Sequence, residues 1–171
     1  IAQVDLPGSP QQLFVHAERA VVYSSLGRKQ TVVLLYDISD RSAPTLIRRF
    51  ELTGRVMTAR RIDNAVHTVI DTATQPLPLH YYPAPQLCKS PTVESQRQTA
   101  IAAFEQVRQT NLELIRKASF QTTFPEYVEA GVAPARRDCS QVYRATEGGV
   151  GFVSLFSFDL TNDQQTPAFT S

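Results

Sequence analysis

The sequence has little net charge and no long apolar run, and each of these absences excludes a class of protein. Its 171 residues carry 17 basic and 16 acidic side chains, which gives a formal net charge of +1. That balance offers no electrostatic basis for binding nucleic acid or an anionic membrane surface. No apolar run reaches the roughly 18 residues that a membrane-spanning helix needs. We therefore expect neither a nucleic-acid partner nor a membrane span in this sequence.

Cysteine is also scarce. Cys88 and Cys139 are too few and too far apart in the sequence for a zinc knuckle. They are either two buried thiols or a disulfide, which requires an oxidising compartment. In the loop-entropy model, closing a loop of about 50 residues would stabilise the fold by roughly 4 kcal/mol. The residues alone leave both alternatives open.

The common signatures of catalysis are missing as well. Neither His-Glu-x-x-His nor Gly-x-Ser-x-Gly occurs, and the glycines of 148–151 lack the spacing of a phosphate-binding loop. The three histidines, His16, His67 and His80, are not spaced as metal ligands. We therefore predict no catalytic residue, no metal and no cofactor.

What the sequence does contain is a series of short segments rich in β-branched and aromatic residues, a pattern typical of antiparallel strands. They are a hairpin at 12–25, a strand at 31–38 buried on both faces, a more exposed strand at 46–52 suited to a sheet edge, and a second hairpin at 55–72. The first hairpin begins near Leu13 and the second near Val56. This spacing of about 43 residues is typical of four-stranded propeller blades.

A long insertion follows the second hairpin. Residues 75–91 are rich in proline and aromatic side chains, whereas residues 92–118 contain no glycine or proline. Apolar side chains of 92–118 fall within an arc of roughly 160° at 100° per residue, which predicts an amphipathic helix packed against the sheet. Arg108 and Asn111 also fall within this arc, which leaves room for a break or bend near them. Residues 124–139 are expected to be irregular.

An acidic turn occurs twice in the chain. "LYDISDRSAP" at 35–44 follows one strand, and "SFDLTNDQQTP" at 157–167 follows another. Placing Asp159 on Asp37 aligns the two stretches, so that residues 153–160 supply the third strand of the second repeat. The two stretches therefore form an internal repeat.

We interpret the acidic residues of these turns as structural. Asp37, Asp40 and Asp159 are expected to accept hydrogen bonds from the backbone two residues on, and Pro44 fixes its own φ. A calcium site built from the same carboxylates is the alternative, although no EF-hand loop occurs.

Together these patterns predict a mainly β fold with a helical insertion. It consists of two four-stranded antiparallel blades of a β-propeller. The first blade spans 1–54 and the second spans 55–171, with the insertion interrupting the second at about 73–150.

The chain resembles the secreted β-propeller-domain proteins of bacteria and archaea, whose blades carry a Tyr-Asp-Ile-Ser-Asp-Pro turn. The matching stretches here are "LYDISDRSAP" (35–44), "RRFELTGRVMTARRIDNAVHTV" (48–69), "FPEY" (124–127), Cys139 and "VSLFSFDL" (153–160). Val66 and His67 depart from the Val-Tyr of that family. The resemblance implies an exported protein and favours a disulfide between Cys88 and Cys139. It also implies that the chain, which begins at Ile1 without methionine, is the first two blades of a longer propeller.

Function is expected in the loops and the insertion, because loops on a rigid scaffold carry recognition. The candidate ligand-binding residues are His80, Tyr81 and Tyr82. We favour a non-catalytic interaction or scaffold module whose partners are a protein or cell-envelope component and the remaining blades. One alternative is a hydrolase-like enzyme completed by other blades, with His80, Tyr81, Asp71 and Glu126 as candidates. The other is a structural envelope component whose helix packs against a neighbouring subunit.

Overall fold

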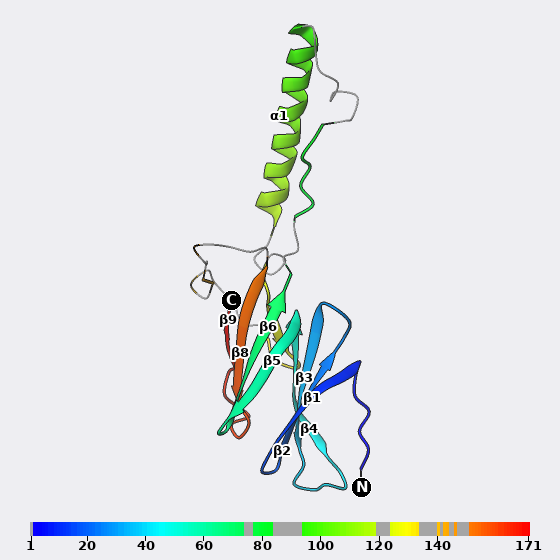
Figure 1. Cartoon of the computed structure of the whole chain (residues 1–171), viewed down its shortest axis with the longest axis vertical. Coiled ribbons are helices and arrows are strands. Elements are labelled where there is room, and N and C mark those ends of the chain that lie inside the picture. The colour runs from blue at the N-terminus through cyan, green and yellow to red at the C-terminus, as the bar shows by residue number, and fades with distance from the viewer. Residues whose placement is uncertain are drawn as a thin grey trace. The chain divides into compact units, whose positions relative to one another are not determined.

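The computed structural model describes residues 2–73, 77–83, 94–118, 124–133, 140, 142–143, 146 and 151–171. The described residues form two antiparallel sheets and one helix (Figure 1). The chain divides into a β unit, residues 1–74 and 124–171, and an insertion unit, residues 75–123. Cys88 and Cys139, and with them the disulfide prediction, lie outside the described residues.

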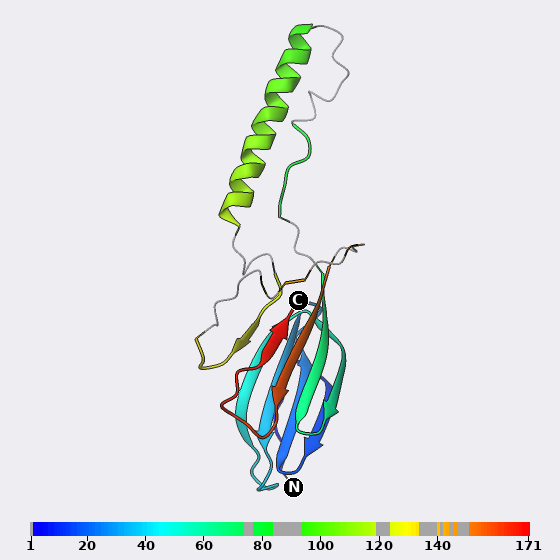
Figure 2. The same ribbon diagram turned by 90° about the vertical axis from the view of Figure 1, so that its left-hand side faces the viewer.

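The β unit contains both sheets. The first sheet has the order β1-β2-β3-β4-β7, with β1 at Ser9–His16, β2 at Arg19–Ser25, β3 at Gln30–Asp37, β4 at Thr45–Thr53 and β7 at Tyr127–Glu129. The second sheet has the order β5-β6-β8-β9, with β5 at Arg55–Ile62, β6 at Ala65–Thr72, β8 at Phe152–Asp159 and β9 at Ala168–Thr170. In Figure 2 the second sheet lies in front of the first. The predicted mainly β architecture with two antiparallel sheets and a helix is confirmed.

The two sheets repeat each other in detail. In each, the first strand contains a β-bulge, which ends at Gln12 in the first sheet and at Thr58 in the second. In each, the first hairpin turns through a non-glycine residue with positive φ, Ala17 or Asp63. Both pairs of equivalent positions are 46 residues apart, slightly more than the spacing of about 43 expected from the hairpin starts.

The main core lies where the two sheets face each other. We call the side of the first sheet that faces this core its front face, and the side of the second sheet that faces this core its back face. The front-face core residues are Val21, Tyr23, Val33, Leu35, Phe50 and Leu52, and the back-face residues include Val66, Ile70, Phe156, Phe158 and Phe169. The Phe50 ring lies 5.3 Å from that of Phe156 and 5.2 Å from that of Phe158, so aromatic contacts join the sheets.

The remaining two faces are covered differently. The back face of the first sheet carries a second, smaller core of Ala20, Val32, Leu34 and Tyr36, against which Leu6, Leu26 and Ile38 pack. By the matching strand registers, the front face of the second sheet includes His67, Val69, Val153, Leu155 and Ser157. Leu155 there is 53% exposed and Val153 is 60% exposed. The second sheet thus presents an open face at the positions that the first sheet buries.

Two expectations for the first sheet are wrong. Residues 124–139 were expected to be irregular, but β7 within them pairs with β4, placing Leu52 opposite Tyr127 and Phe50 opposite Glu129. As a result the first sheet has five strands, and β4 is not an edge strand. Phe50 and Leu52 are fully buried in the core between the two sheets, and β7 pairs with the edge that β4 would otherwise leave open.

Gly54 allows the chain to pass from β4 directly into β5. Its φ is +112°, and a Cβ at this position would lie 2.2 Å from Thr72 Oγ1 and 2.6 Å from the Asp71 carbonyl oxygen. Any side chain would therefore clash with β6. The Gly54 carbonyl accepts a hydrogen bond of 3.0 Å from Thr31, which ties this junction to β3.

The insertion unit is built around α1, at Glu94–Lys117. This agrees with the helix predicted at 92–118. α1 continues without a break through Arg108 and Asn111, the two polar residues of its apolar arc. Arg116 and Lys117 lie in the last turn, where positive charge favours a helix C-terminus. No helix in the described part of the chain is long and apolar enough to cross a membrane.

Candidate recognition groove

An extended segment, residues 77–83, lies against α1 within the insertion unit. The His80 N–H donates a hydrogen bond of 2.9 Å to Asn111 Oδ1, and Asn111 Nδ2 donates one of 2.6 Å to the His80 carbonyl. One side-chain amide therefore satisfies both backbone groups of a single residue, as a neighbouring strand would. This pairing explains why a polar residue occupies the apolar arc of the helix.

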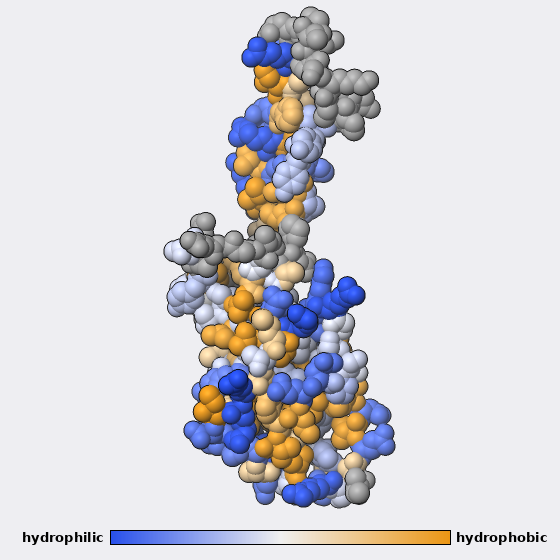
Figure 3. Space-filling view, viewed as in Figure 1, coloured by the Kyte–Doolittle hydropathy of each residue, from blue (hydrophilic) through white to orange (hydrophobic). Residues whose placement is uncertain are grey.

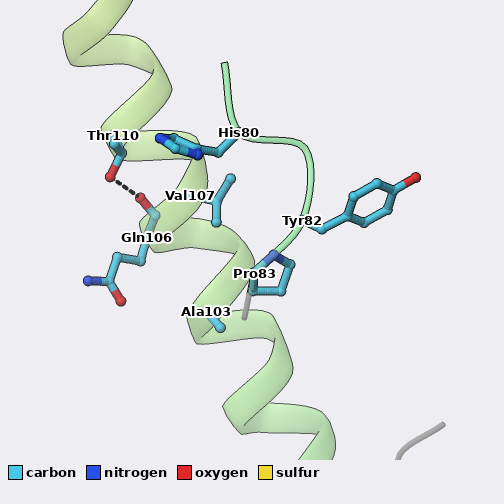
Figure 4. A pocket seen from close by; sticks show the side chains of 7 residues that line it. All are labelled: His80, Tyr82, Pro83, Ala103, Gln106, Val107 and Thr110. Carbon is cyan, nitrogen blue, oxygen red and sulfur yellow. Dashed lines mark hydrogen bonds between the residues drawn. The ribbon is translucent and has the colours of Figure 1, made fainter. Parts of the chain in front are cut away.

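A groove of about 360 Å³ lies between the segment and the helix. Its lining residues are His80, Tyr82 and Pro83 from the segment and Ala103, Gln106, Val107 and Thr110 from α1 (Figure 4). The Thr110 hydroxyl donates to the Gln106 carbonyl at 3.0 Å, so its hydrogen is already used within the helix. The groove therefore combines the aliphatic side chains of Ala103 and Val107 with the His80 ring, while the Gln106 amide points away from the segment (Figure 4).

The aromatic side chains of the segment point in different directions. Figure 4 shows the His80 ring directed toward α1 and the Tyr82 ring directed away from it. Tyr81 and Tyr82 are 73% and 76% exposed, and Pro83 between Tyr82 and the helix is buried. Of the three candidate ligand-binding residues, His80 and Tyr82 line the groove, whereas Tyr81 does not. Exposed tyrosines beside an apolar groove are frequent anchors in protein recognition.

The acidic turns form hydrogen-bonded corners of the two sheets. Asp37 Oδ1 accepts the Ser39 N–H at 2.8 Å, and Asp40 Oδ1 accepts the Ser42 N–H at 2.8 Å. In the second sheet, Asp159 Oδ1 accepts the Thr161 N–H at 2.7 Å. Each carboxylate thus bonds the backbone two residues on, as in an Asx turn.

These hydrogen bonds lower the pKa values of the three carboxyl groups. Hydrogen bonds from Ser39, assisted by the nearby Arg19 guanidinium, lower the pKa of Asp37 to about 2. Arg19 forms an ion pair with Asp37 and a longer one, 3.4 Å, with Asp163 of the second sheet. The cation at this point is therefore a side chain, which disfavours the calcium alternative.

The four candidates for an enzyme are divided between the two units of the chain. His80 and Tyr81 belong to the insertion unit, whereas Asp71 and Glu126 belong to the β unit. Asp71 is an exposed residue of β6, and the main-chain carbonyl of Glu126 accepts a hydrogen bond of 3.0 Å from Thr53. Among the residues that the structure describes, no three His, Cys, Asp or Glu side chains are grouped as metal ligands.

A polar pocket of about 400 Å³ in the β unit was not foreseen from the sequence. Arg48 and Glu129 line it together with Asp163. Arg48 Nε lies 2.6 Å from Glu129 Oε1, and a second hydrogen bond of 2.8 Å completes a two-point ion pair. Arg48 also donates to the Gln165 carbonyl at 3.0 Å, so it joins β4, β7 and the turn before β9.

Pairs of arginines such as Arg48-Arg49 usually mark solvated surfaces, but Arg48 is buried. Its acidic partner is 81 residues away, on a strand that the sequence did not predict. Within "FPEYVEAG" only the adjacent Tyr127 and Val128 favour a strand, which is too short a signal to predict one. Asp163 Oδ1 is buried beside this pocket and has no hydrogen-bond partner among the described residues.

Comparison with known proteins agrees with this architecture. The family model of the beta propeller domain matches residues 1–171. The chain belongs to the beta propeller domain family. No curated protein and no solved structure shows significant similarity to it. In this propeller domain the two sheets correspond to blades, and the insertion unit is an addition to the repeating β pattern.

Proposed function

We propose that the chain is a non-catalytic binding module of an exported β-propeller protein, and that the groove of the insertion unit binds an extended segment of a protein or cell-envelope partner. The observation that carries this proposal is the groove itself, flanked by the exposed Tyr81 and Tyr82. The blades serve as the scaffold that holds the insertion.

The chemistry of the groove favours a proline-containing or apolar peptide. Ala103, Val107 and Pro83 offer a floor for one aliphatic side chain or one proline ring, and the His80 ring lines the same groove. Aromatic-lined grooves accept proline rings, and a proline-rich segment that already forms a polyproline II helix loses little conformational entropy when it binds. Because the groove is shallow, we expect affinities in the micromolar range, about −8 kcal/mol or weaker.

We also propose that the open front face of the second sheet receives a further sheet of the same propeller. The front face of the first sheet packs on the back face of the second sheet. Because this contact uses two different surfaces, the front face of the second sheet is left free. Val69 and Leu155 are two aliphatic residues of that free face, at the positions of Tyr23 and Val33 in the first sheet. A further sheet with a back face like that of β6 and β8 would complete the stack.

The groove is tested by selecting peptides from a phage-displayed 12-residue library on the whole chain, then measuring their affinity by calorimetry. Tyr82→Ala and Val107→Asp are expected to weaken binding at least about tenfold, because they remove an anchor and place a charge on the floor. Tyr143→Ala is the matched control, since Tyr143 is 75% exposed and lies in the β unit. Selected peptides that bind all three variants as they bind the unchanged chain would contradict the proposal.

A further inference from the structure

α1 carries a second surface, about 150° around the helix from the groove at 100° per residue. We call it the seam. Its five residues, Ile101, Phe104, Arg108, Leu112 and Ile115, fall within roughly 80° of arc. Ile101, Phe104 and Ile115 are 52%, 48% and 48% exposed. In the space-filling view of Figure 3, apolar side chains of α1 reach the surface along its length.

The seam is symmetric about Arg108. Ile101 and Ile115 lie seven residues before and after it, and Phe104 and Leu112 lie four residues before and after it. The spacing from Ile101 to Ile115 covers four turns at an average of about 3.5 residues per turn, the period of a coiled-coil seam. Two such helices running in opposite directions would place Ile101 on Ile115 and Phe104 on Leu112 at both ends.

The charges at the centre suit the same arrangement. Arg108 Nε and Nη2 donate hydrogen bonds of 2.8 and 2.7 Å to the two carboxylate oxygens of Glu105, so each guanidinium has its own counter-ion. In an antiparallel pair centred on Arg108, the two glutamates would lie on either side of the two arginines. The order along the seam would be negative, positive, positive, negative, so every arginine would have an acidic group nearby.

We propose that the seam is a homodimer interface, through which α1 pairs antiparallel with α1 of a second copy of this chain, about a twofold axis at Arg108. A twofold contact needs the same surface on both partners, with residue i against residue j and residue j against residue i. Any two antiparallel copies of α1 meet this condition. The palindromic order of the seam also places apolar side chains against apolar side chains at both ends, which a foreign partner would not require. The inference goes beyond the proposed function, because the seam and the groove lie on different sides of α1 and neither depends on the other.

The expected complex is small and weak. The paired stretch from 101 to 115 would extend about 21 Å at 1.5 Å per residue, with helices crossing at about 20°. An interface of this size belongs with transient contacts, for which we expect a dissociation constant on the order of 100 µM.

The test is sedimentation equilibrium of the whole chain, at concentrations from about 10 to about 500 µM, chosen to bracket that expected constant. The unchanged chain should approach a dimer. Ile101→Lys and Ile115→Glu should each weaken association at least about tenfold, because each places one charge in an apolar contact. Ala102→Lys is the matched control, since Ala102 is exposed and lies 100° from Ile101 on the helix. It should leave association unchanged, and circular dichroism verifies that all variants keep their helix.

The decisive measurement mixes Ile101→Lys with Ile115→Glu. In the antiparallel arrangement the new lysine of one chain meets the new glutamate of the other, and the opposite end keeps its two isoleucines. The mixture should therefore associate, although each variant alone does not. A wild-type chain that stays monomeric over the whole concentration range would overturn the proposal. Association that survives Ile101→Lys, or a mixture that stays monomeric, would also overturn it.

Discussion

The first and second sheets share a β-bulge, a hairpin turn with a positive φ and an acidic turn (the Asp corner, at Asp37 and Asp159) at matching positions. Only the first sheet buries its front face. The difference shows in the side chains. Where the first sheet has Val21 and Leu35, the second has His67 and Ser157, whose Nδ1 and Oγ atoms lie 2.9 Å apart. The backbone pattern of a blade is therefore kept while the chemistry of one face changes.

This change bears on what the open face can contact. His67 and Ser157 satisfy each other across two strands, so the face carries a polar pair beside the apolar Val69 and Leu155. A sheet that packs on it would bury a mixed surface rather than a core like that around Phe50. The contact between the second sheet and a further sheet should consequently be weaker per unit area than the contact between the first and second sheets.

The largest expected effect concerns a position at which the two sheets differ in charge, Arg48 in the first and Ala168 in the second. Arg48→Ala would leave Glu129 without its partner in a site where the two side chains are only 6% and 13% exposed. Removing one partner of a buried ion pair costs about 3–5 kcal/mol, so urea unfolding should show a loss of that size. The variant also removes the guanidinium that lies 4.8 Å from the Phe50 ring.

The double variant Arg48→Met with Glu129→Leu separates two explanations of such a loss. If the unpaired carboxylate is the cause, the double variant should recover most of the stability, because it leaves no charge buried. A double variant as unstable as Arg48→Ala would instead show that the link from Arg48 to the Gln165 carbonyl is what matters.

A smaller effect is expected from the same substitution on the two front faces. Leu35 is fully buried on the first sheet, whereas Leu155 is half-exposed on the second. Leu35→Ala should lower the free energy of unfolding by about 2–4 kcal/mol, since it opens a cavity in the core. Leu155→Ala should change it by less than about 0.5 kcal/mol in this chain. Equal losses in the two variants would mean that the front face of the second sheet is already covered.

How much of this could be predicted from the sequence depended on how local each feature is. The hairpins, the long buried strand β3 and the Asp corners follow from patterns within about ten residues, and sequence analysis placed them correctly. β7 is only three residues long, so alternation was too short to reveal it. The interior position of β4 in its sheet and the ion pair of Arg48 then could not be foreseen, because both depend on that distant strand.

The candidate groove shows the same division. Proline and aromatic content identified the segment around His80 as a loop with recognition potential. The role of Asn111 was not visible, because its partner lies 31 residues earlier in an extended segment. The polar Asn111 in the apolar arc suggested a break in the helix. In the structure the helix is continuous, and Asn111 anchors the segment around His80 to it.

The smallest expected effect compares the two Asp corners at low pH. The pKa of Asp37 is about 2 in the folded chain, and that of Asp159 is also lowered, in both cases chiefly by hydrogen bonds from the residue two positions on. Because an unfolded aspartate titrates near about 4, these corners stabilise the fold fully above that pH and lose this contribution as the pH falls toward about 2. Asp37→Asn and Asp159→Asn should each reduce the drop in thermal midpoint between about pH 5 and about pH 2.5.

Salt should separate the two corners. Arg19 contacts Asp37 and has no equivalent at Asp159, because Ala65 occupies the matching position in the second sheet. At about 1 M salt the screening length falls to about 3 Å, which weakens the ion pair but leaves the hydrogen bonds from Ser39 and Thr161 in place. The difference between Asp37→Asn and the unchanged chain should therefore shrink with salt. The difference for Asp159→Asn should shrink less, because hydrogen bonds from Thr161 act on Asp159 more strongly than the charge of His16 does. Thermal midpoints at low and high salt measure this, and the same salt response at both corners would show that Arg19 adds nothing to the first.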